Sequence, residues 1–231
     1  MSIKGLIFDF DGIILDTEIP EYQSWKEIFA EFGQDLPISI WTGYIGAGRT
    51  SFDPLAYLNQ LTGLGLSDAD IHPRRILRAD ALQAEKGLYP GVLDYLNTAK
   101  DQGLKLAIAS SSDRPWVVNH LKDYDLFDLF DVVFTADEVE NVKPEPELFL
   151  KALVALGLPK DEALIFEDSP NGILAARRAG IRCVCVPNEI TREMDTSAAD
   201  FTIPSMASLP LRQLLDMVQK TPQAVQSGGE R

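Results

Sequence analysis

Two aspartates stand where the first apolar run of the chain ends. Asp9 and Asp11 follow the run at residues 3–8, and Gly12 comes directly after them. Residues at positions i and i+2 of an extended chain face the same way, so the two carboxylates are expected to converge. Because like charges repel, this arrangement indicates a bound divalent cation, which could in turn hold a phosphate. The alternative for these residues alone is a solvated turn.

Two later segments add groups that suit phosphate oxygens. Ser110 and Ser111 end the apolar run at 104–110 and offer hydroxyl and backbone N–H donors. Lys143 precedes a proline in the segment VKPEPE and offers an ammonium group. That charge could neutralise a phosphate or hold a nucleophilic carboxylate. For each segment taken alone, an ordinary loop or a surface lysine is the competing interpretation.

Glu167 and Asp168 end the apolar run at 163–167 and begin the segment EDSPNG. Carboxylate oxygens are ligands for hard divalent cations, and a helix N-terminus at this position favours anions. In open α/β sheets, ligands bind at the carboxyl ends of the strands. Two acids, a hydroxyl, a cation and two further acids therefore fall at successive strand ends in one order.

The elements that must position these groups alternate along the chain. Helical patterns separate the apolar runs, as in residues 147–156, which end at Gly157, and in the helix expected to begin with Ser169 as N-cap and Pro170. This alternation predicts an α/β fold with a doubly wound, Rossmann-like, mostly parallel sheet. The predicted strands are residues 3–8, 104–110, 131–135, 163–167, 182–187 and 199–203.

One long segment breaks the alternation. Residues 17–86 contain no strand pattern but show helical spacing, with helices expected near 51–61 and 67–85. We interpret this segment as an α-helical cap domain inserted after the first strand. The expected division is a core domain of residues 1–16 and 87–218, the cap of residues 17–86, and a disordered tail of residues 219–231.

Composition narrows the class of partner. The 231 residues are 45% apolar and carry a formal net charge of −14, which disfavours nucleic acid and anionic membranes as partners. No run approaches a membrane span, and the N-terminus lacks a signal-peptide pattern. Cys183 and Cys185 are expected to be buried and unpaired. We expect a soluble, cytoplasmic protein that is a monomer or a weak homodimer.

The segments DFDG, ASSS, VKPEPE and FEDSPNG resemble, in this order, the four motifs of the haloacid dehalogenase superfamily. With its helical insertion, the chain is similar over residues 3–215 to the β-phosphoglucomutase-like phosphatases of that superfamily. The resemblance implies a Mg²⁺-dependent phosphatase that forms an aspartyl phosphate on Asp9. It also implies that Asp11 is the general acid and base.

The same resemblance implies the other roles. Ser110 and Lys143 would bind phosphate, and we add Ser111 from its neighbouring hydroxyl. Mg²⁺ would lie on Asp9, on the backbone carbonyl of Asp11 and on Asp168, with Glu167 ligating directly or through water. The implied partner is a small phosphorylated metabolite, such as a phosphosugar.

In the predicted cap, Arg49 of the segment YIGAGRTSF resembles a substrate-facing arginine of the family. Glu21 stands near the position at which the mutases carry a histidine, and neither His72 nor His120 is placed to replace it. This departure favours water as the final phosphate acceptor. A β-phosphoglucomutase-type mutase is the alternative, and a non-catalytic binding or regulatory protein on the same fold is a second. The cluster of Arg74, Arg75 and Arg78 is interpreted as a solvated helix face.

Overall fold

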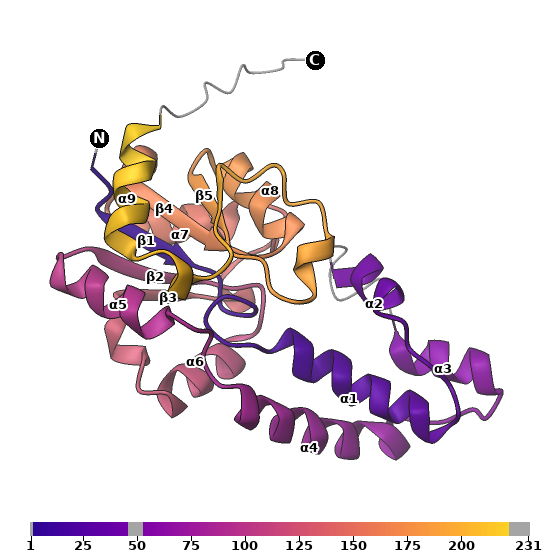
Figure 1. Cartoon of the computed structure of the whole chain (residues 1–231). Helices are drawn as coiled ribbons and strands as arrows, with labels where there is room; N and C mark the ends of the chain where they lie inside the picture. The colour runs from indigo at the N-terminus through magenta and orange to yellow at the C-terminus, as the bar shows by residue number, and fades with distance from the viewer. Residues whose placement is uncertain (1, 46–52, 222–231) are drawn as a thin grey trace.

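A computed structural model describes residues 2–45 and 53–221 of the chain. Its centre is a six-stranded sheet in the order β3-β2-β1-β4-β5-β6, and every neighbouring pair is parallel. Figure 1 shows this sheet with helices on both sides. The predicted doubly wound α/β fold is therefore confirmed. The strands are β1 (Gly5–Phe8), β2 (Lys105–Ala109), β3 (Val132–Phe134), β4 (Ala163–Glu167), β5 (Arg182–Cys185) and β6 (Phe201–Thr202).

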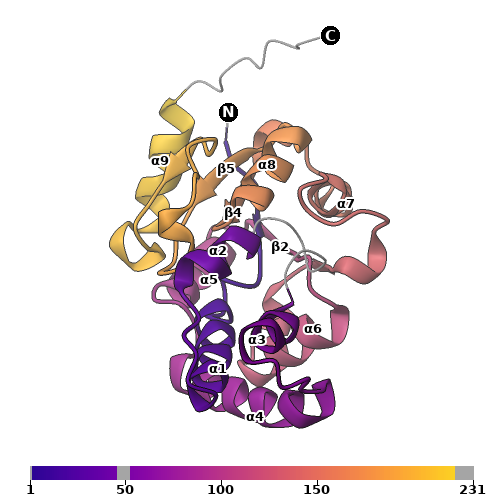
Figure 2. The same ribbon diagram turned by 90° about the vertical axis from the view of Figure 1, so that its right-hand side faces the viewer.

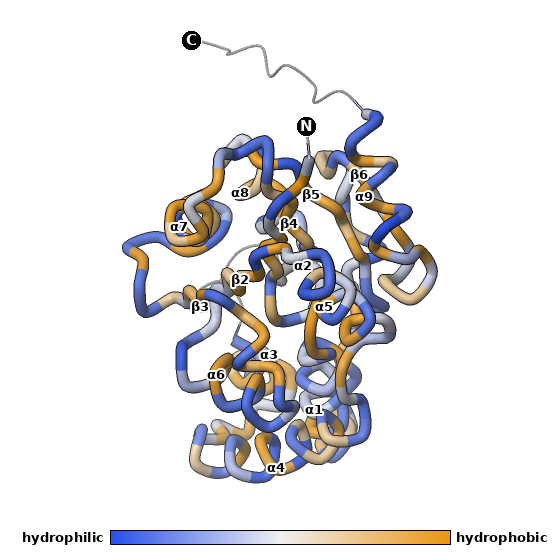
Figure 3. The backbone as a smooth tube through the Cα atoms, turned by 90° about the vertical axis from the view of Figure 1, so that its left-hand side faces the viewer, coloured by the Kyte–Doolittle hydropathy of each residue, from blue (hydrophilic) through white to orange (hydrophobic). Residues whose placement is uncertain are grey.

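The strands at the centre of the sheet are apolar on both faces, as parallel strands covered by helices must be. In β1, Leu6 and Phe8 face one core cluster while Ile7 faces the other. Figure 3 shows the strands as largely apolar segments through the middle of the molecule. Cys183 and Cys185 share one face, and both are free and buried, as predicted.

Helices cover the two faces of the sheet. One core cluster joins the sheet to α5 (Val92–Asp101), α6 (Arg114–Asp123) and α9 (Leu211–Lys220). The other joins it to α7 (Glu147–Leu156) and α8 (Pro170–Ala179). Figure 2 shows α9 and α7 on opposite sides of the sheet. Because both faces are closed, polar chemistry is left to the strand ends.

Between β1 and α5, the described ranges contain four helices: α1 (Glu18–Glu31), α2 (Ile38–Ile45), α3 (Pro54–Thr62) and α4 (Asp68–Lys86). We call them the helical insertion. They extend to one side of the sheet, with α1 beside α4, and they have their own apolar cluster around Phe29, Leu36 and Leu58. Ser67 and Asp70 form a capping box at the start of α4, where the helix near residues 67–85 was expected.

Three ion pairs join α1 to α4, and they correct one prediction. Arg74 pairs with Glu31, Arg75 with Glu21 and Arg78 with Glu27. Arg74 and Arg78 are exposed, as expected for a solvated face. Arg75 is only 8% exposed and lies over the ring of Trp25. The interpretation of Arg75 as a solvated residue was therefore wrong, because its helix face turns towards α1.

The described ranges bear on two further predictions. Arg49, predicted to face the substrate, and residues 222–231 of the predicted tail lie outside the described ranges. The helix α9 runs to Lys220 and so extends past residue 218, where the core domain was expected to end. None of the helices in the described ranges combines the length and apolar composition that a bilayer crossing requires.

A close contact between α8 and β4 yields the first prediction. A Cβ atom on Gly172 would lie 1.6 Å from Oε1 of the fully buried Glu167. We expect Gly172→Ala to lower the free energy of unfolding by about 3 kcal/mol, since neither the helix nor the carboxylate can withdraw. Chemical denaturation measures the change. Leu174→Ala, on the outer face of the same helix, should cost less than about 1 kcal/mol; equal effects would show that the contact is relieved easily.

Candidate active site

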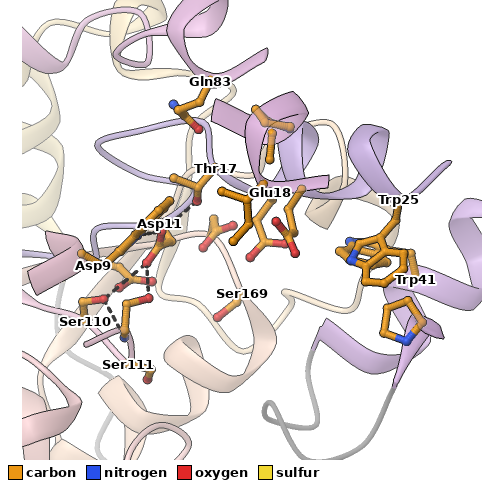
Figure 4. Close-up of a pocket in the computed structure, with 18 of the residues that line it drawn as sticks. Asp9, Asp11, Thr17, Glu18, Trp25, Trp41, Gln83, Ser110, Ser111 and Ser169 are labelled. Carbon is orange, nitrogen blue, oxygen red and sulfur yellow. Dashed lines mark hydrogen bonds between the residues drawn. The ribbon is translucent and has the colours of Figure 1, made fainter. Parts of the chain in front are cut away.

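The carboxyl ends of β1, β2 and β4 open into one cavity of about 820 Å³. β1 lies between β2 and β4, so the chain leaves these neighbouring strands at the point where the strand order reverses. Figure 4 shows Asp9, Asp11 and Ser110 together on one side of this cavity, and Trp25 and Trp41 on the other. The core supplies the first group, and the helical insertion supplies the second.

Lys143 joins the ends of two strands. Its Nζ lies 2.7 Å from Oδ1 of Asp9 and 2.7 Å from Oε1 of Glu167. Burial by itself lowers the pKa of Lys143, but the charges of the two carboxylates outweigh it and raise that pKa. The ammonium therefore stays protonated. The backbone N–H of Phe10 also donates to Oδ1 of Asp9, at 2.8 Å, so Oδ2 is not held by either donor.

Both carboxylate oxygens of Glu167 accept hydrogen bonds. Its Oε1 accepts a hydrogen bond from Nζ of Lys143. Its Oε2 accepts hydrogen bonds from the backbone N–H of Asp168 and from the N–H and hydroxyl of Ser169, at 2.9–3.0 Å. These donors lie at the start of α8, where N–H groups are free to bind an anion. The geometry makes Glu167 the fixed support of Lys143.

Asp9, Glu167 and Asp168 each place a carboxylate oxygen within 4.8 Å of the others. Burial, opposed by Lys143 and reinforced by Glu167, raises the pKa of Asp9 well above its ordinary value. Burial and the charges of Glu167 and Asp9 do the same for the pKa of Asp168. Three buried acids beside one ammonium therefore need further positive charge to ionise together. Hard oxygen donors in this arrangement fit a divalent cation such as Mg²⁺.

The backbone conformation and close packing at Gly12 explain why a glycine follows the two aspartates. Its φ is +79°, and a Cβ atom there would lie 2.3 Å from Oδ2 of Asp168 and 2.9 Å from Nδ2 of Asn188. Only glycine leaves this space beside the carboxylate. Asn188 donates from Nδ2 to Oδ2 of Asp168 at 2.7 Å. The Asn188 Oδ1 accepts from the backbone N–H groups of Ile190 and Thr191, which fixes the orientation of the amide.

In an extended chain the carboxylates of Asp9 and Asp11 would converge, but the carboxylate of Asp11 points away from the group formed by Asp9, Glu167 and Asp168. β1 ends at Phe8, and the turn at Gly12 follows. Oδ1 of Asp11 accepts from the hydroxyl of Thr17 at 2.8 Å and from Nε1 of Trp116 at 3.0 Å. Its Oδ2 accepts from the hydroxyl of Ser112 at 2.6 Å. Asp11 lines the cavity beside Asp9 but stands outside the group of three acids.

The serine loop after β2 also lies in the cavity. The Ser110 hydroxyl accepts from the N–H of Ser112 at 3.0 Å and lies 3.4 Å from Oδ2 of Asp11. The Ser111 hydroxyl is buried and has no hydrogen-bond partner within the described ranges. A buried hydroxyl without a partner is costly, and an anion at this position would remove the cost.

Of the predicted insertion residues, Glu21 lines the cavity and pairs with Arg75. Thr17, Trp116 and Asn188 also belong to the site, and their roles were not predicted from the sequence. Thr17 and Trp116 carry no local signal, because they reach Asp11 only through the folding of the insertion and the serine loop. Asn188 follows β5, which lies beside β4, so the strand order could have identified it.

The Asn188 contacts yield the second prediction. We expect Asn188→Ala to lower the free energy of unfolding by about 2–3 kcal/mol, because two buried N–H groups lose their acceptor and Asp168 loses a donor. Urea denaturation of the metal-free protein measures it. Asn119→Ala, at an exposed position of α6, is the matched control and should change stability by less than about 0.5 kcal/mol. A loss no larger than the control's would show that the loop needs no amide.

Comparisons with known proteins agree with this geometry. Residues 6–186 match the family model of haloacid dehalogenase-like hydrolases. The candidate phosphatase YhcW of Bacillus subtilis is 50% identical over 93% of this chain and 97% of its own length. Hexitol phosphatase B of Escherichia coli is 30% identical over 93% and 97% of the two chains.

Among solved structures, CbbY of Rhodobacter sphaeroides in complex with xylulose-1,5-bisphosphate is 30% identical, with a TM-score of 0.70. The match covers 90% of this chain and 96% of that one. Both the core and the helical insertion are thus shared with relatives across nearly their full lengths. The chain belongs to the haloacid dehalogenase-like hydrolase family.

Proposed function

We propose that this protein is a Mg²⁺-dependent phosphatase that hydrolyses small phosphorylated metabolites, sugar phosphates above all, through an aspartyl phosphate on Asp9. The observation that carries the proposal is the buried bridge from Asp9 through Lys143 to Glu167, at strand ends that face a cavity. Several relatives are named as phosphatases, among them a phosphorylated-carbohydrate phosphatase of Thermotoga maritima and hexitol phosphatase B.

Asp9 is the residue best placed to attack phosphorus. Its Oδ1 is anchored by Lys143 and by the N–H of Phe10, which leaves Oδ2 for the reaction. Covalent transfer to this carboxylate divides one difficult displacement into two easier steps. Lys143 also places a fixed positive charge where the transferring phosphoryl oxygens develop negative charge. Ser110 and Ser111 supply hydroxyls on the same side of the cavity.

Asp11 supplies the proton transfers. It would protonate the leaving alkoxide in the first step and activate water in the second, a role worth roughly 10²–10⁴-fold in rate. The hydrogen bonds from Thr17, Ser112 and Trp116 hold its carboxylate at the cavity wall. Water is the expected acceptor because Glu21, where the mutases have a histidine, is engaged with Arg75.

Asp9 and Asp168 would hold Mg²⁺ with their carboxylates, and Asp11 with its backbone carbonyl. When bound, the ion neutralises the phosphoryl group and lets the buried acids stay ionised. Gly12 and Asn188 keep the space beside Asp168 open and its carboxylate oriented.

The third prediction tests Asp9. We expect Asp9→Asn to lower kcat for p-nitrophenyl phosphate by at least ~10³-fold, because an amide cannot form the acyl phosphate. Release of inorganic phosphate measures turnover, and conversion of a hexose 1-phosphate to its 6-phosphate would reveal the mutase instead. Asp123→Asn, at an exposed end of α6, is the control. Equal activity in wild type and Asp9→Asn would remove Asp9 as nucleophile. Absence of turnover with any phosphate ester would favour the non-catalytic alternative.

The fourth prediction concerns the cation and needs no turnover. Mg²⁺ at about 100 times its Kd should add about 2.7 kcal/mol to stability, and this raises Tm by roughly 5–10 °C for a chain of this size. Asp168→Asn should reduce the shift to below ~2 °C, while Asp123→Asn should keep it.

The size of this shift should also depend on pH. The pKa values of Asp9 and Asp168 are higher in the folded protein than their ordinary value of 3.8. Their protonation therefore stabilises the metal-free protein fully at a pH below 3.8, and this stabilisation is lost as the pH rises through the folded-state pKa values. The shift should therefore be larger at pH 8 than at pH 5. Differential scanning fluorimetry gives the result, and a shift that Asp168→Asn leaves intact would place the ion elsewhere.

A further inference from the structure

Trp116 contacts Asp11 from the core side of the cavity. It lies in the first turn of α6 and lines the cavity, and its Nε1–H donates to Oδ1 of Asp11 at 3.0 Å. The hydroxyl of Thr17 donates to the same oxygen at 2.8 Å. The hydroxyl of Ser112 donates to Oδ2 at 2.6 Å. The two oxygens of this carboxylate therefore meet different donors.

The indole of Trp116 is held in place by its own helix. The backbone N–H of Trp116 donates at 2.9 Å to Oδ1 of Asp113, the N-cap of α6. His120 stands one turn later on the same face of the helix. The centres of the two rings lie 4.2 Å apart, and Nδ1 of His120 lies 2.9 Å from the backbone carbonyl oxygen of Trp116. The indole also packs against the apolar cluster between α6 and the sheet, so the direction of its N–H is set by the fold.

The three donors to Asp11 differ in what they can do. A hydroxyl rotates and can accept as well as donate, whereas an indole N–H can only donate. Oδ1, which faces the indole, must therefore remain an acceptor, while the Ser112 hydroxyl beside Oδ2 can turn to accept a proton's hydrogen bond. Thr17 is the N-cap of α1, so its hydroxyl belongs to the helical insertion. Trp116 belongs to the core, and its contact does not depend on where the insertion lies.

We infer that Trp116 is a positioning residue for proton transfer by Asp11. Its indole N–H holds Oδ1 against the core and presents Oδ2 to the serine loop, where the Ser110 hydroxyl lies 3.4 Å away. Oδ2 is then the oxygen that gives its proton to the leaving alkoxide, as the P–O bond to that group breaks and Asp9 bonds to phosphorus. The inference rests on the proposed phosphatase function and assigns different tasks to the two oxygens of Asp11.

The test compares two esters of similar shape whose leaving groups differ. The ester 4-nitrobenzyl phosphate releases an alkoxide, which must be protonated as it leaves, whereas p-nitrophenyl phosphate releases a phenolate that is stable without a proton. For both we would measure kcat/KM, which reports the steps up to departure of the leaving group. Poor positioning of the general acid should slow the nitrobenzyl ester selectively. A change in phosphate or cation binding should slow both esters equally.

Trp116→Phe removes the N–H and keeps an aromatic ring against His120. It should lower kcat/KM for the nitrobenzyl ester by roughly 10- to 100-fold, the range for one hydrogen bond to a charged group. For p-nitrophenyl phosphate the loss should be less than about threefold. Tyr124→Phe is the matched control, because it also removes one polar group from an aromatic side chain on the same apolar cluster, and Tyr124 is not among the described residues that line the cavity. It should leave both values unchanged.

A double-mutant cycle shows whether Trp116 acts through Asp11. In an Asp11→Asn background, Trp116→Phe should change kcat/KM for the nitrobenzyl ester by less than about twofold, because no acid is left to position. A second measurement does not need a folded Trp116→Phe. The nuclear magnetic resonance signal of the Trp116 indole N–H proton should move upfield in Asp11→Ala, which removes its acceptor, and stay in place in Asp123→Asn.

Two failures can be told apart. If no ester releases phosphate with Mg²⁺ in the wild type, the proposed function fails. If phosphate is released but Trp116→Phe slows both esters by the same factor, or keeps its full effect in the Asp11→Asn background, the inference fails and the phosphatase stands. An indole signal that Asp11→Ala leaves in place would also overturn the inference, because the hydrogen bond would then be absent in solution.

Discussion

The structure depends on a local charge imbalance that the fold holds in place. Asp9, Glu167 and Asp168 are all buried at the strand ends, and Lys143 is the ammonium that lies among them. Burying charge is costly unless it is paired and hydrogen-bonded, so the surroundings supply donors. The backbone N–H groups of Asp168 and Ser169, directly before α8, donate to Glu167, and the Asn188 amide donates to Asp168. The negative charge that these donors leave uncompensated is the charge that the proposed cation would neutralise.

Two glycines show how closely the backbone must approach these acids. Gly12 leaves room beside Asp168, and Gly172 leaves room beside Glu167. A side chain at either position would force a carboxylate out of its hydrogen bonds. Both glycines belong to the motifs DFDG and FEDSPNG, so their presence follows from packing around buried charge. The same packing holds Lys143 at 2.7 Å from two acids, a geometry that a flexible surface lysine would not keep.

Much of the fold and of the candidate site could be predicted from the sequence. The reason is that parallel strands covered on both faces appear as short apolar runs with polar groups at their ends. Residues 163–167 and 147–156 match β4 and α7 at both boundaries. The errors arise where tertiary contacts decide. Arg75 was misjudged because its partner Glu21 is distant in sequence. α2 (Ile38–Ile45) was not anticipated, since its apolar and β-branched residues show no polar face.

The loop after β5 connects the two parts of the site. Asn188 orients Asp168, while Ile190, two residues later, is buried in the apolar cluster of the helical insertion with Ile19 and Trp25. The backbone N–H of Ile190 donates to the Asn188 side chain at 2.9 Å. Any shift of the insertion relative to the sheet must therefore either strain this loop or carry it along. Through this loop, the helical insertion that lines the cavity is also connected to Asp168, the acid proposed to hold the cation.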